Sequence, residues 1–492
     1  MATPPISTPP KSNNPFAPRR YGVLQQVTDS VFIIRNITNS SFVIGDRSVA
    51  VIDTQVNASS ASELLRLIRT VTKKPIEFVI NTHYHWDHTN GNALFKKEGA
   101  TVISSAMTKK FMVERAPRQK EFLSGRGFEL GEDPFLPEKT FEGETEIDLG
   151  NMPLRLFYAG SAETEDATAV HVLHERVVMS GDTVMTGSFP IFGQPVWDEG
   201  LEGDDRWLRT LDVLMSLRAE HIIPGHGPLA QAPEVELLIR TQHYFIEEVG
   251  ALVKKGLDVK AVLSDLEAGL PKWITDMPIV WGTPRYAILR VFRGLTKKPQ
   301  DIEPGWQTFK PSAIPTPKKS GNIPSSDSVE GYRQMASEAR EGGDSGLEIA
   351  ILKKASLVFP SSCDILAGYA DALIEASKRE ASVLEKGDFF QEARIAWDRA
   401  LAMDAVHIPS LLGKGRYLTM MAYRGGDDPS EGMRYLRKVI ELKTDPRVQA
   451  EAEFYLGMGL RRLGNEMRAK AQFQKALMID PSFVPAAMAA QA

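Results

Sequence analysis

The segment Asn81–Asn92, NTHYHWDHTNGN, places three histidines and one aspartate within six residues. Neutral imidazole nitrogens bind zinc and similar ions well, and a nearby carboxylate compensates the charge of the metal. His83 and His85 are two residues apart and can converge on one ion, whereas Asp87 and His88 fall on the next turn and can face a second ion. A polar loop that only caps a helix does not need this set of side chains, so the spacing predicts a two-metal site.

The elements around this segment predict a layered α/β sheet that ends at the histidines. The segment Ala58–Val71 has apolar residues at helical spacing and serines near its start as potential caps. The next apolar run, Ile76–Thr82, predicts a strand that leads directly into the histidines. Strand, helix and strand in this order indicate an α/β fold with active residues at strand ends. Three further strands are predicted upstream at Val31–Asn36, Ser41–Asp46 and Val49–Thr54.

An HxHxDH motif after an apolar strand resembles the metal-binding motif of the metallo-β-lactamase superfamily. The resemblance covers roughly residues 22–295 and implies an αββα sandwich with a dinuclear site. Asp182, in GDT, then matches the aspartate that bridges the two metals, and His226, in PGHG, matches the last ligand of the second metal. The glycines on both sides of His226 allow the backbone to approach a buried site closely. Asp53, in VIDT, matches an aspartate near the base of the site.

One position departs from the superfamily pattern. Most members supply a further histidine to the first metal, and the matching residue here is Glu163, nineteen residues before Asp182. A glutamate can still ligate, but it makes the site more negative and the first metal less electrophilic. The alternative ligands are His171, which lies within a predicted strand, and His174, which lies at a turn. Glu163 is similar to the glutamate of the alkylsulfatase branch, although that branch has a second glutamate in place of Asp182.

The resemblance implies a cofactor of two divalent ions, with zinc as the expected metal and iron or manganese as alternatives. Ions held about 3.5–4 Å apart can share a bridging hydroxide and polarise the substrate. Asp87 takes the catalytic role by resemblance, because it would orient the hydroxide and shuttle a proton. We expect hydrolysis of an ester-type bond in a small molecule, either sulfatase-like or in a carboxylic or phosphoric ester.

Aromatic and basic residues near the motifs are candidates for substrate contacts, each with a structural alternative. Aromatic residues between the ligands or after the bridging aspartate either contact substrate or pack beneath the site. Arginines in the segment 107–141 either receive an anionic group or form a solvated basic face. The predicted contacts are Tyr84, Trp86, Arg126, Phe189 and Trp197, and the same alternatives apply to Arg115, Arg118 and Phe192.

The C-terminal third has a different character. Residues 296–329 are rich in proline, lysine and serine, which predicts a linker between a domain at 21–295 and a second domain at 330–492. The second domain resembles tetratricopeptide repeats, in which small and large residues let two antiparallel helices interlock. A helical bundle with alanine-rich seams is the alternative. The clearest unit begins at Ala450 and has Leu456, Gly457, Ala469, Phe473, Ala476 and Pro481 at the expected positions; Trp397 anchors another. Such repeats predict a protein partner or self-association.

The bulk composition excludes several other functions. A net charge of −5 over 492 residues gives no reason to expect nucleic acid as a partner. Apolar runs are too short for a membrane span. Residues 1–20 contain no apolar stretch of a signal peptide and predict a disordered N-terminus, and the one cysteine, Cys363, excludes an internal disulfide. These features predict a cytoplasmic protein.

Two alternative activities remain compatible with the motifs. The first is a mononuclear iron oxygenase of the same fold, which uses two histidines and one carboxylate and leaves positions open for oxygen. The second is a hydrolase of the thioesterase, lactonase or β-lactamase type, which differs in the bond that the pocket admits.

Overall fold

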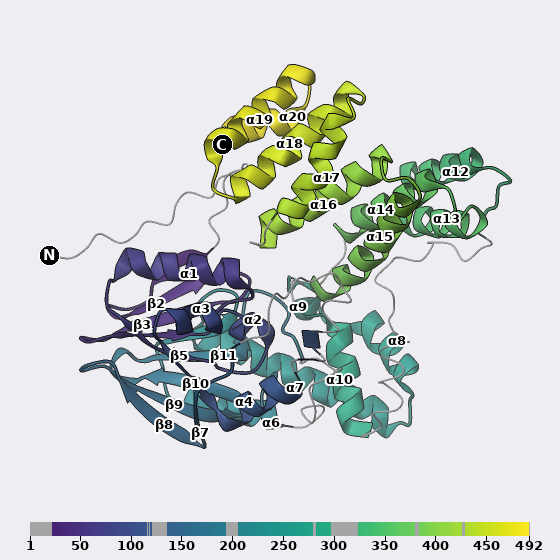
Figure 1. The fold of residues 1–492 in the computed structure, drawn as a ribbon. Coiled ribbons are helices and arrows are strands. Elements are labelled where there is room, and N and C mark those ends of the chain that lie inside the picture. The colour runs from purple at the N-terminus through teal and green to yellow at the C-terminus, as the bar shows by residue number, and fades with distance from the viewer. Residues whose placement is uncertain are drawn as a thin grey trace. The chain divides into compact units, whose positions relative to one another are not determined.

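The computed structural model describes residues 22–115, 117, 119–120, 135–192, 205–278, 282–296, 323–378, 383–425 and 429–491 (Figure 1). Contacts within the chain group it into two compact units. The first contains the elements between Val23 and Thr296, and the second contains those between Val329 and Gln491. The predicted disordered N-terminus and most of the predicted linker lie outside the described residues.

Two β-sheets form the centre of the first unit. The seven-stranded sheet follows the chain from β1 to β7, antiparallel up to β4 and parallel from there on. The five-stranded sheet has the order β12-β11-β10-β9-β8, and only its β11–β12 pair is parallel. The strands are β1 (Val23–Gln26), β2 (Val31–Arg35), β3 (Ser40–Ile44), β4 (Val49–Ile52), β5 (Ile76–Ile80), β6 (Thr101–Ser105), β7 (Lys139–Phe141), β8 (Glu144–Asp148), β9 (Pro153–Gly160), β10 (Ala167–Val172), β11 (Val177–Met185) and β12 (His221–His226).

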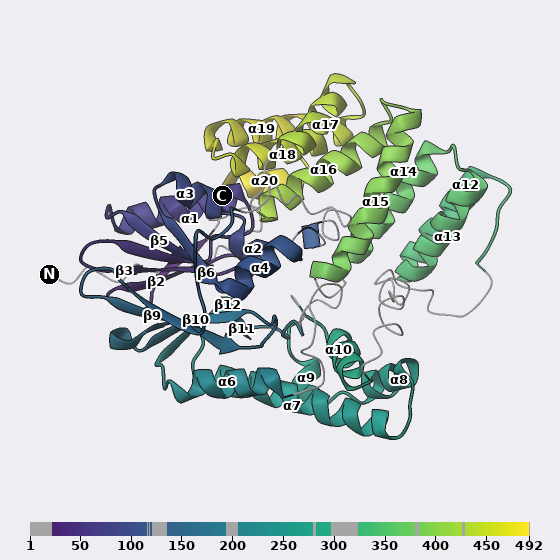
Figure 2. The same cartoon turned by 60° about the horizontal axis from the view of Figure 1, so that its bottom comes forward.

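Helices cover the outer faces of both sheets (Figure 2). Helix α1 (Ala58–Val71) and α3 (Asn92–Lys97) pack on the seven-stranded sheet, and α6 (Arg206–Ser216) and α7 (Ala232–Lys254) pack on the five-stranded one. A separate apolar core joins the inner faces of the two sheets. This helix–sheet–sheet–helix order agrees with the predicted αββα sandwich.

The alternation of side chains explains why β2 lies between two cores. Val31 and Ile33 point into the core between the sheets, whereas Phe32 and Ile34 point toward the α1 side. Helix α1 has the predicted bounds, but its N-cap is Asn57 and not a serine. The Asn57 side chain accepts a hydrogen bond from the Ser60 backbone N–H, and the Ser60 hydroxyl accepts one from the Asn57 N–H.

Further helices extend the first unit. Helices α7, α8 and α10 share an apolar core with Phe189 and Phe192. The remaining elements are α2 (Trp86–Thr89), α4 (Ala106–Glu114), η1 (Leu173–Glu175), α8 (Val259–Gly269), α9 (Lys272–Thr275) and α10 (Pro284–Thr296).

The second unit is helical throughout the part of it that the structure describes. Helix α12 packs on α13 and α13 on α14, and each helix from α16 to α19 packs on the next one. Helices α14, α16 and α18 also contact one another in series. Tetratricopeptide identity remains a prediction. No described helix of the chain is both long and apolar enough to cross a bilayer. The helices are α12 (Val329–Glu341), α13 (Ser345–Val358), α14 (Cys363–Ser377), α15 (Val383–Met403), α16 (Ile408–Gly425), α17 (Ser430–Glu441), α18 (Pro446–Arg462), α19 (Glu466–Ile479) and α20 (Val484–Gln491).

The contact between α18 and α19 depends on Gly457. A Cβ atom at this position would lie 2.5 Å from the ring of Phe473, which is completely buried. We therefore expect Gly457→Ala to lower the free energy of unfolding by about 1–3 kcal/mol through overpacking. Gly368→Ala in α14 is the matched control, because its Cβ would meet only Leu352 at 3.8 Å. There alanine should raise helix stability by up to about 1 kcal/mol. Urea unfolding of the full chain measures both changes, and equal effects would contradict the packing argument.

Candidate metal centre

The seven predicted ligands lie in two groups that the structure brings together. His83, His85, Glu163 and Asp182 form one group, here called the first subsite, with ligand atoms within 4.8 Å of one another. A second group with the same spacing, the second subsite, contains Asp87, His88 and His226. Among the described residues, these are the only clusters of at least three possible metal ligands.

These side chains come from the ends of strands in both sheets. His83 and His85 follow β5 directly, and Asp87 and His88 lie on the short helix α2. Glu163 lies in the connection between β9 and β10, Asp182 within β11, and His226 at the last position of β12. Parallel neighbours such as β11 and β12 end at the same edge of a sheet, so residues far apart in the chain meet there.

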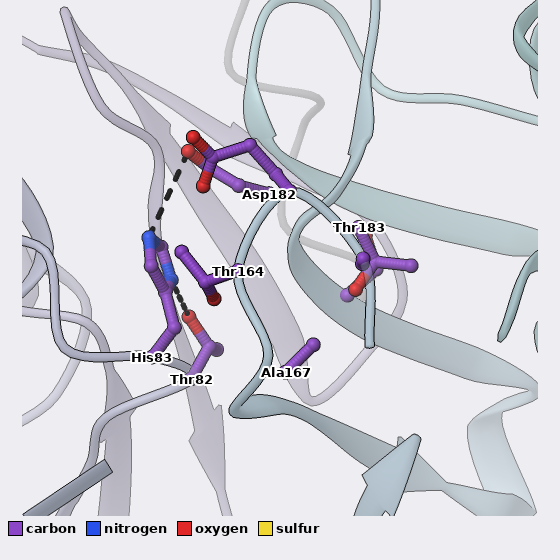
Figure 3. A pocket seen from close by; sticks show the side chains of 9 residues that line it. Thr82, His83, Thr164, Ala167, Asp182 and Thr183 are labelled. Atoms are coloured by element: carbon purple, nitrogen blue, oxygen red, sulfur yellow. Dashed lines mark hydrogen bonds and ion pairs between the residues drawn. The ribbon is translucent and has the colours of Figure 1, made fainter. Parts of the chain in front are cut away.

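Asp182 faces imidazoles of both subsites. Figure 3 shows its carboxylate beside His83. Its carboxylate is 3.8 Å from His83 Nε2, 3.2 Å from His88 Nε2 and 3.3 Å from His226 Nε2. Gly225 permits this position, because a Cβ atom there would lie 1.8 Å from Asp182 Oδ1. The expectation that a glycine beside His226 serves close approach therefore agrees with the structure.

A buried carboxylate at the end of β4 orients two of the histidines. Asp53 Oδ2 accepts hydrogen bonds from His88 Nδ1 and from the hydroxyl of Thr82, both at 2.8 Å. Because the Thr82 hydroxyl donates to Asp53, it accepts from His83 Nδ1 at 3.0 Å. Both imidazoles thereby carry their proton on Nδ1 and direct Nε2 toward Asp182. Asp53 adopts a left-handed backbone conformation, φ 59°, and such strained geometry clusters at functional sites.

The second subsite receives its orientation from the loop between β2 and β3. His226 Nδ1 donates a hydrogen bond to the backbone oxygen of Ile37 at 2.8 Å, which leaves Nε2 directed at Asp87 and Asp182. Asp87 Oδ2 accepts a hydrogen bond of 2.8 Å from the Thr38 hydroxyl.

The electrostatics of the two subsites favour a bound cation. Burial lowers the pKa of His83 well below its ordinary value, so its imidazole is a neutral ligand. Burial also opposes charge on His226, but Asp182 and Asp87 outweigh it and raise the pKa of His226 to about 10. The pKa of His88 is likewise raised by these carboxylates and Asp53. The carboxylates that raise these pKa values also attract a metal ion, and binding of the ion displaces any proton held at the Nε2 atoms.

Unpartnered atoms provide a second test of whether a metal fits. Nowhere in the described part of the chain do His83 Nε2, His88 Nε2 or Asp182 Oδ1 find a hydrogen-bond partner. Buried polar atoms are nearly always satisfied, so an exception needs an explanation. Imidazole nitrogens and a carboxylate oxygen that converge on one volume are a suitable donor set for a transition metal.

Glu163 belongs to the cluster of possible ligands in the first subsite. It is 1% exposed, and its Oε2 is 3.3 Å from His85 Nδ1. The two alternative histidines lie elsewhere: His171 is within β10 and His174 is in η1, and neither belongs to a described ligand cluster. The Glu163 segment is fixed nearby, because Glu165 forms a two-pronged ion pair with Arg115 at 2.6 and 3.1 Å.

The residues predicted to contact substrate differ in how far the structure buries them. Tyr84 is completely buried against Phe111 and Met112, and Phe189 is completely buried in the α7–α10 core. Burial favours the packing alternative for both residues. Trp86 is partly exposed at the start of α2, and its role stays a prediction. Three further candidates, Arg118, Arg126 and Trp197, lie outside the described residues.

Sequence reasoning missed three residues that support the ligands. Thr82 lies inside the histidine motif, where its position before His83 was a usable signal. Thr38 is separated from Asp87 by 49 positions, and nothing in its own neighbourhood indicated the contact. Gln55 donates to the Thr38 backbone oxygen, again without a local signal.

Comparison with known proteins finds similarity to the first unit. Residues 33–226 match the model of the Metallo-beta-lactamase superfamily. The chain is 25% identical over 209 residues to 2,4-dinitroanisole O-demethylase subunit alpha of Nocardioides sp. (strain JS1661), an alignment that covers 42% of this chain and 55% of that protein. It is 20% identical over 302 residues to the linear primary-alkylsulfatase of Pseudomonas sp. (strain ATCC 19151), covering 52% and 56%. The chain thus spans little more than half the length of each relative.

Among solved structures, a metallo-beta-lactamase from Pontibacter korlensis is similar in fold to part of this chain. The two share 19% identity with a TM-score of 0.38, and the match covers 44% of this chain and 97% of that one.

Proposed function

We propose, from the premise that residues 33–226 form a metallo-beta-lactamase superfamily domain, that the chain is a dinuclear metal-dependent hydrolase. The bond we expect it to cleave is an ester-type bond of a small molecule, in the first place a sulfatase-like substrate. The proposal rests above all on the position of Asp182, whose carboxylate lies within 3.8 Å of imidazole nitrogens from both subsites.

The donor sets of the two subsites are equivalent when Asp182 is counted in both. Each then has two imidazoles and two carboxylates, because Glu163 belongs to the first and Asp87 to the second. Two-metal hydrolases need ions held close together by shared and separate ligands, and this set can provide both. Zinc suits such imidazole-rich sites, and the carboxylates make manganese or iron the alternatives.

Asp87 has a different role in hydrolysis from the more deeply buried carboxylates. When bound, two divalent ions supply a water of lowered pKa and polarise the bond that is cleaved. Asp87 is the most accessible ligand carboxylate, at 14% exposure, compared with 5% for Asp182 and 1% for Glu163. Substrate and water therefore reach the second subsite from the side of Asp87. From this position its carboxylate can orient the attacking water and accept its proton.

The proposed substrate class draws on the donor set and on the relatives. Glu163 replaces a neutral donor by an anionic one, as in the alkylsulfatase branch. Both relatives are named for cleavage at an oxygen of a small organic molecule, in one case 2,4-dinitroanisole and in the other a linear primary alkylsulfate. We propose that the helical second unit consists of tetratricopeptide-like repeats that bind a protein partner or a second copy.

Metal analysis and a substrate panel test this function. The full-length protein should contain two equivalents of metal, and a chelator should abolish hydrolysis of sulfate, carboxylic or phosphoric esters until metal is returned. Less than one equivalent of metal, or hydrolysis that persists in chelator, would contradict the proposal. One equivalent of iron with oxygen consumption on thiol substrates would instead favour the oxygenase.

A further inference from the structure

The loop between β2 and β3, residues 36–39, contacts the second subsite at two points. Its Thr38 side chain is completely buried and donates a hydrogen bond to Asp87 Oδ2 at 2.8 Å. The same oxygen is 3.3 Å from His226 Nε2. The hydroxyl therefore holds the Asp87 carboxylate in the rotamer that faces the other ligands.

The loop also fixes the turn that carries His226. The Ile37 backbone oxygen accepts from His226 Nδ1. The side-chain amide of Asn39 donates to the backbone oxygens of Pro224 and Gly227, both at 2.8 Å, and its backbone N–H donates to the Gly225 oxygen at 2.8 Å. Three hydrogen bonds from one residue to one turn leave His226 little freedom to move relative to the loop.

Gln55, a residue with a strained backbone, also holds the loop. Gln55 is 1% exposed and has a φ of 78°, in the region that non-glycine residues avoid. Its amide nitrogen donates to the Thr38 backbone oxygen at 2.8 Å and to the Ser40 hydroxyl at 2.7 Å. Its amide oxygen accepts from Asn36 at 3.2 Å. Backbone strain that persists at such a point indicates that the surrounding contacts require this geometry.

We propose that residues 36–39 form a positioning element for the second subsite and that Thr38, acting through Asp87, sets the affinity of the second metal. This inference rests on the proposed dinuclear function. In the first subsite, His83 is oriented by the Thr82 hydroxyl and not by residues 36–39. Loss of the Thr38 hydroxyl should therefore weaken one ion and spare the other. Removal of a group that orients a metal ligand typically costs 10–100-fold in metal affinity.

The test compares wild-type protein with Thr38→Val and Thr38→Ser. Thr38→Val keeps the shape of the side chain and removes the donor, whereas Thr38→Ser keeps the donor. Full-length proteins stripped of metal are titrated with zinc chloride in competition with a chromophoric chelator. In Thr38→Val the first zinc should bind as in wild type and the second 10–100-fold more weakly. Thr38→Ser should restore the second affinity to within about 3-fold of wild type, which a purely structural role would not predict.

Each outcome separates the inference from the function on which it rests. Two zinc ions bound with unchanged affinities by Thr38→Val would overturn the role of the loop alone. Equal weakening of both ions, with circular dichroism and thermal unfolding unchanged, would also overturn it. A wild-type protein that binds fewer than two ions would overturn the dinuclear function itself. If Thr38→Val does not fold, Thr38→Ala removes the hydroxyl without placing a methyl group against Asp87 and gives the same comparison.

Discussion

Replacing Asp182 with alanine is expected to empty both subsites together. Its carboxylate faces imidazole nitrogens of His83, His88 and His226 and is the only predicted ligand placed to serve both ions. The Asp182→Ala protein should bind less than half an equivalent of zinc where wild type binds two. Hydrolysis should fall by about 10³-fold or more, because metal ions contribute several kcal/mol of transition-state stabilisation. Elemental analysis and initial rates on one ester substrate measure the two effects.

The matched control for this prediction is Asp212→Ala. Asp212 is an exposed acid on α6 of the same unit and lies outside both ligand clusters. The Asp212→Ala protein should keep two equivalents of zinc and hydrolyse the ester at the wild-type rate. Circular dichroism shows whether the Asp182 variant is folded, since loss of metal must be separated from loss of structure. A folded Asp182→Ala protein that retains two ions would contradict a shared ligand at this position.

The sequence predicted the strands and helices that carry the ligands because their signals are local. β2 and β5 are runs of β-branched and aromatic residues, and α1 has apolar residues at helical spacing, so each could be recognised without knowledge of its partners. The histidine motif is also local, with His83 and His88 only five positions apart. Asp182 and His226 were found by resemblance, and the structure places both beside the local motif.

Thr38 and Gln55 could not be predicted as supports of the ligands, because their roles depend on tertiary contacts. Thr38 lies in a four-residue hairpin loop that would suit any polar side chain, and only the arrangement of β2 to β5 within the seven-stranded sheet brings it to Asp87. Arg115 was a candidate for an anionic substrate, but it pairs with Glu165, 50 positions further along the chain. Proximity to a motif in sequence does not say which way a side chain points.

The direction of large aromatic side chains near the motif could not be predicted from the sequence either. Tyr84 lies between two ligands in sequence, yet its ring is completely buried against Phe111 and Arg115 lies over both rings. In an irregular segment no periodicity assigns a residue to the inner or outer face, so composition alone could not separate packing from contact. In the second unit, by contrast, the resemblance to tetratricopeptide repeats indicated positions where helices interlock, and Trp397 and Phe473 are completely buried there.

Glu163→Gln is expected to remove the first ion and leave the second. The amide keeps the size of the side chain but loses the negative charge, and a neutral amide oxygen is a weaker zinc ligand than a carboxylate. Because Glu163 lies 3.3 Å from His85 Nδ1 and is almost completely buried, water cannot easily replace it. Bound zinc should fall from two equivalents to one, and hydrolysis should fall about 100-fold or more if both ions share the work. Glu142→Gln, at an exposed position, should change neither quantity.

A histidine at the same position provides the sharper test of this ligand. Glu163→His offers a neutral imidazole, so two zinc ions should remain bound, while competition with manganese should shift toward zinc because the first subsite loses an anionic oxygen. Elemental analysis after equilibration with equal zinc and manganese measures the shift. The His171 alternative predicts the opposite pattern: Glu163→Gln would keep two ions and His171→Ala would lose one. His171 lies within β10 and outside both ligand clusters, so we expect His171→Ala to retain both.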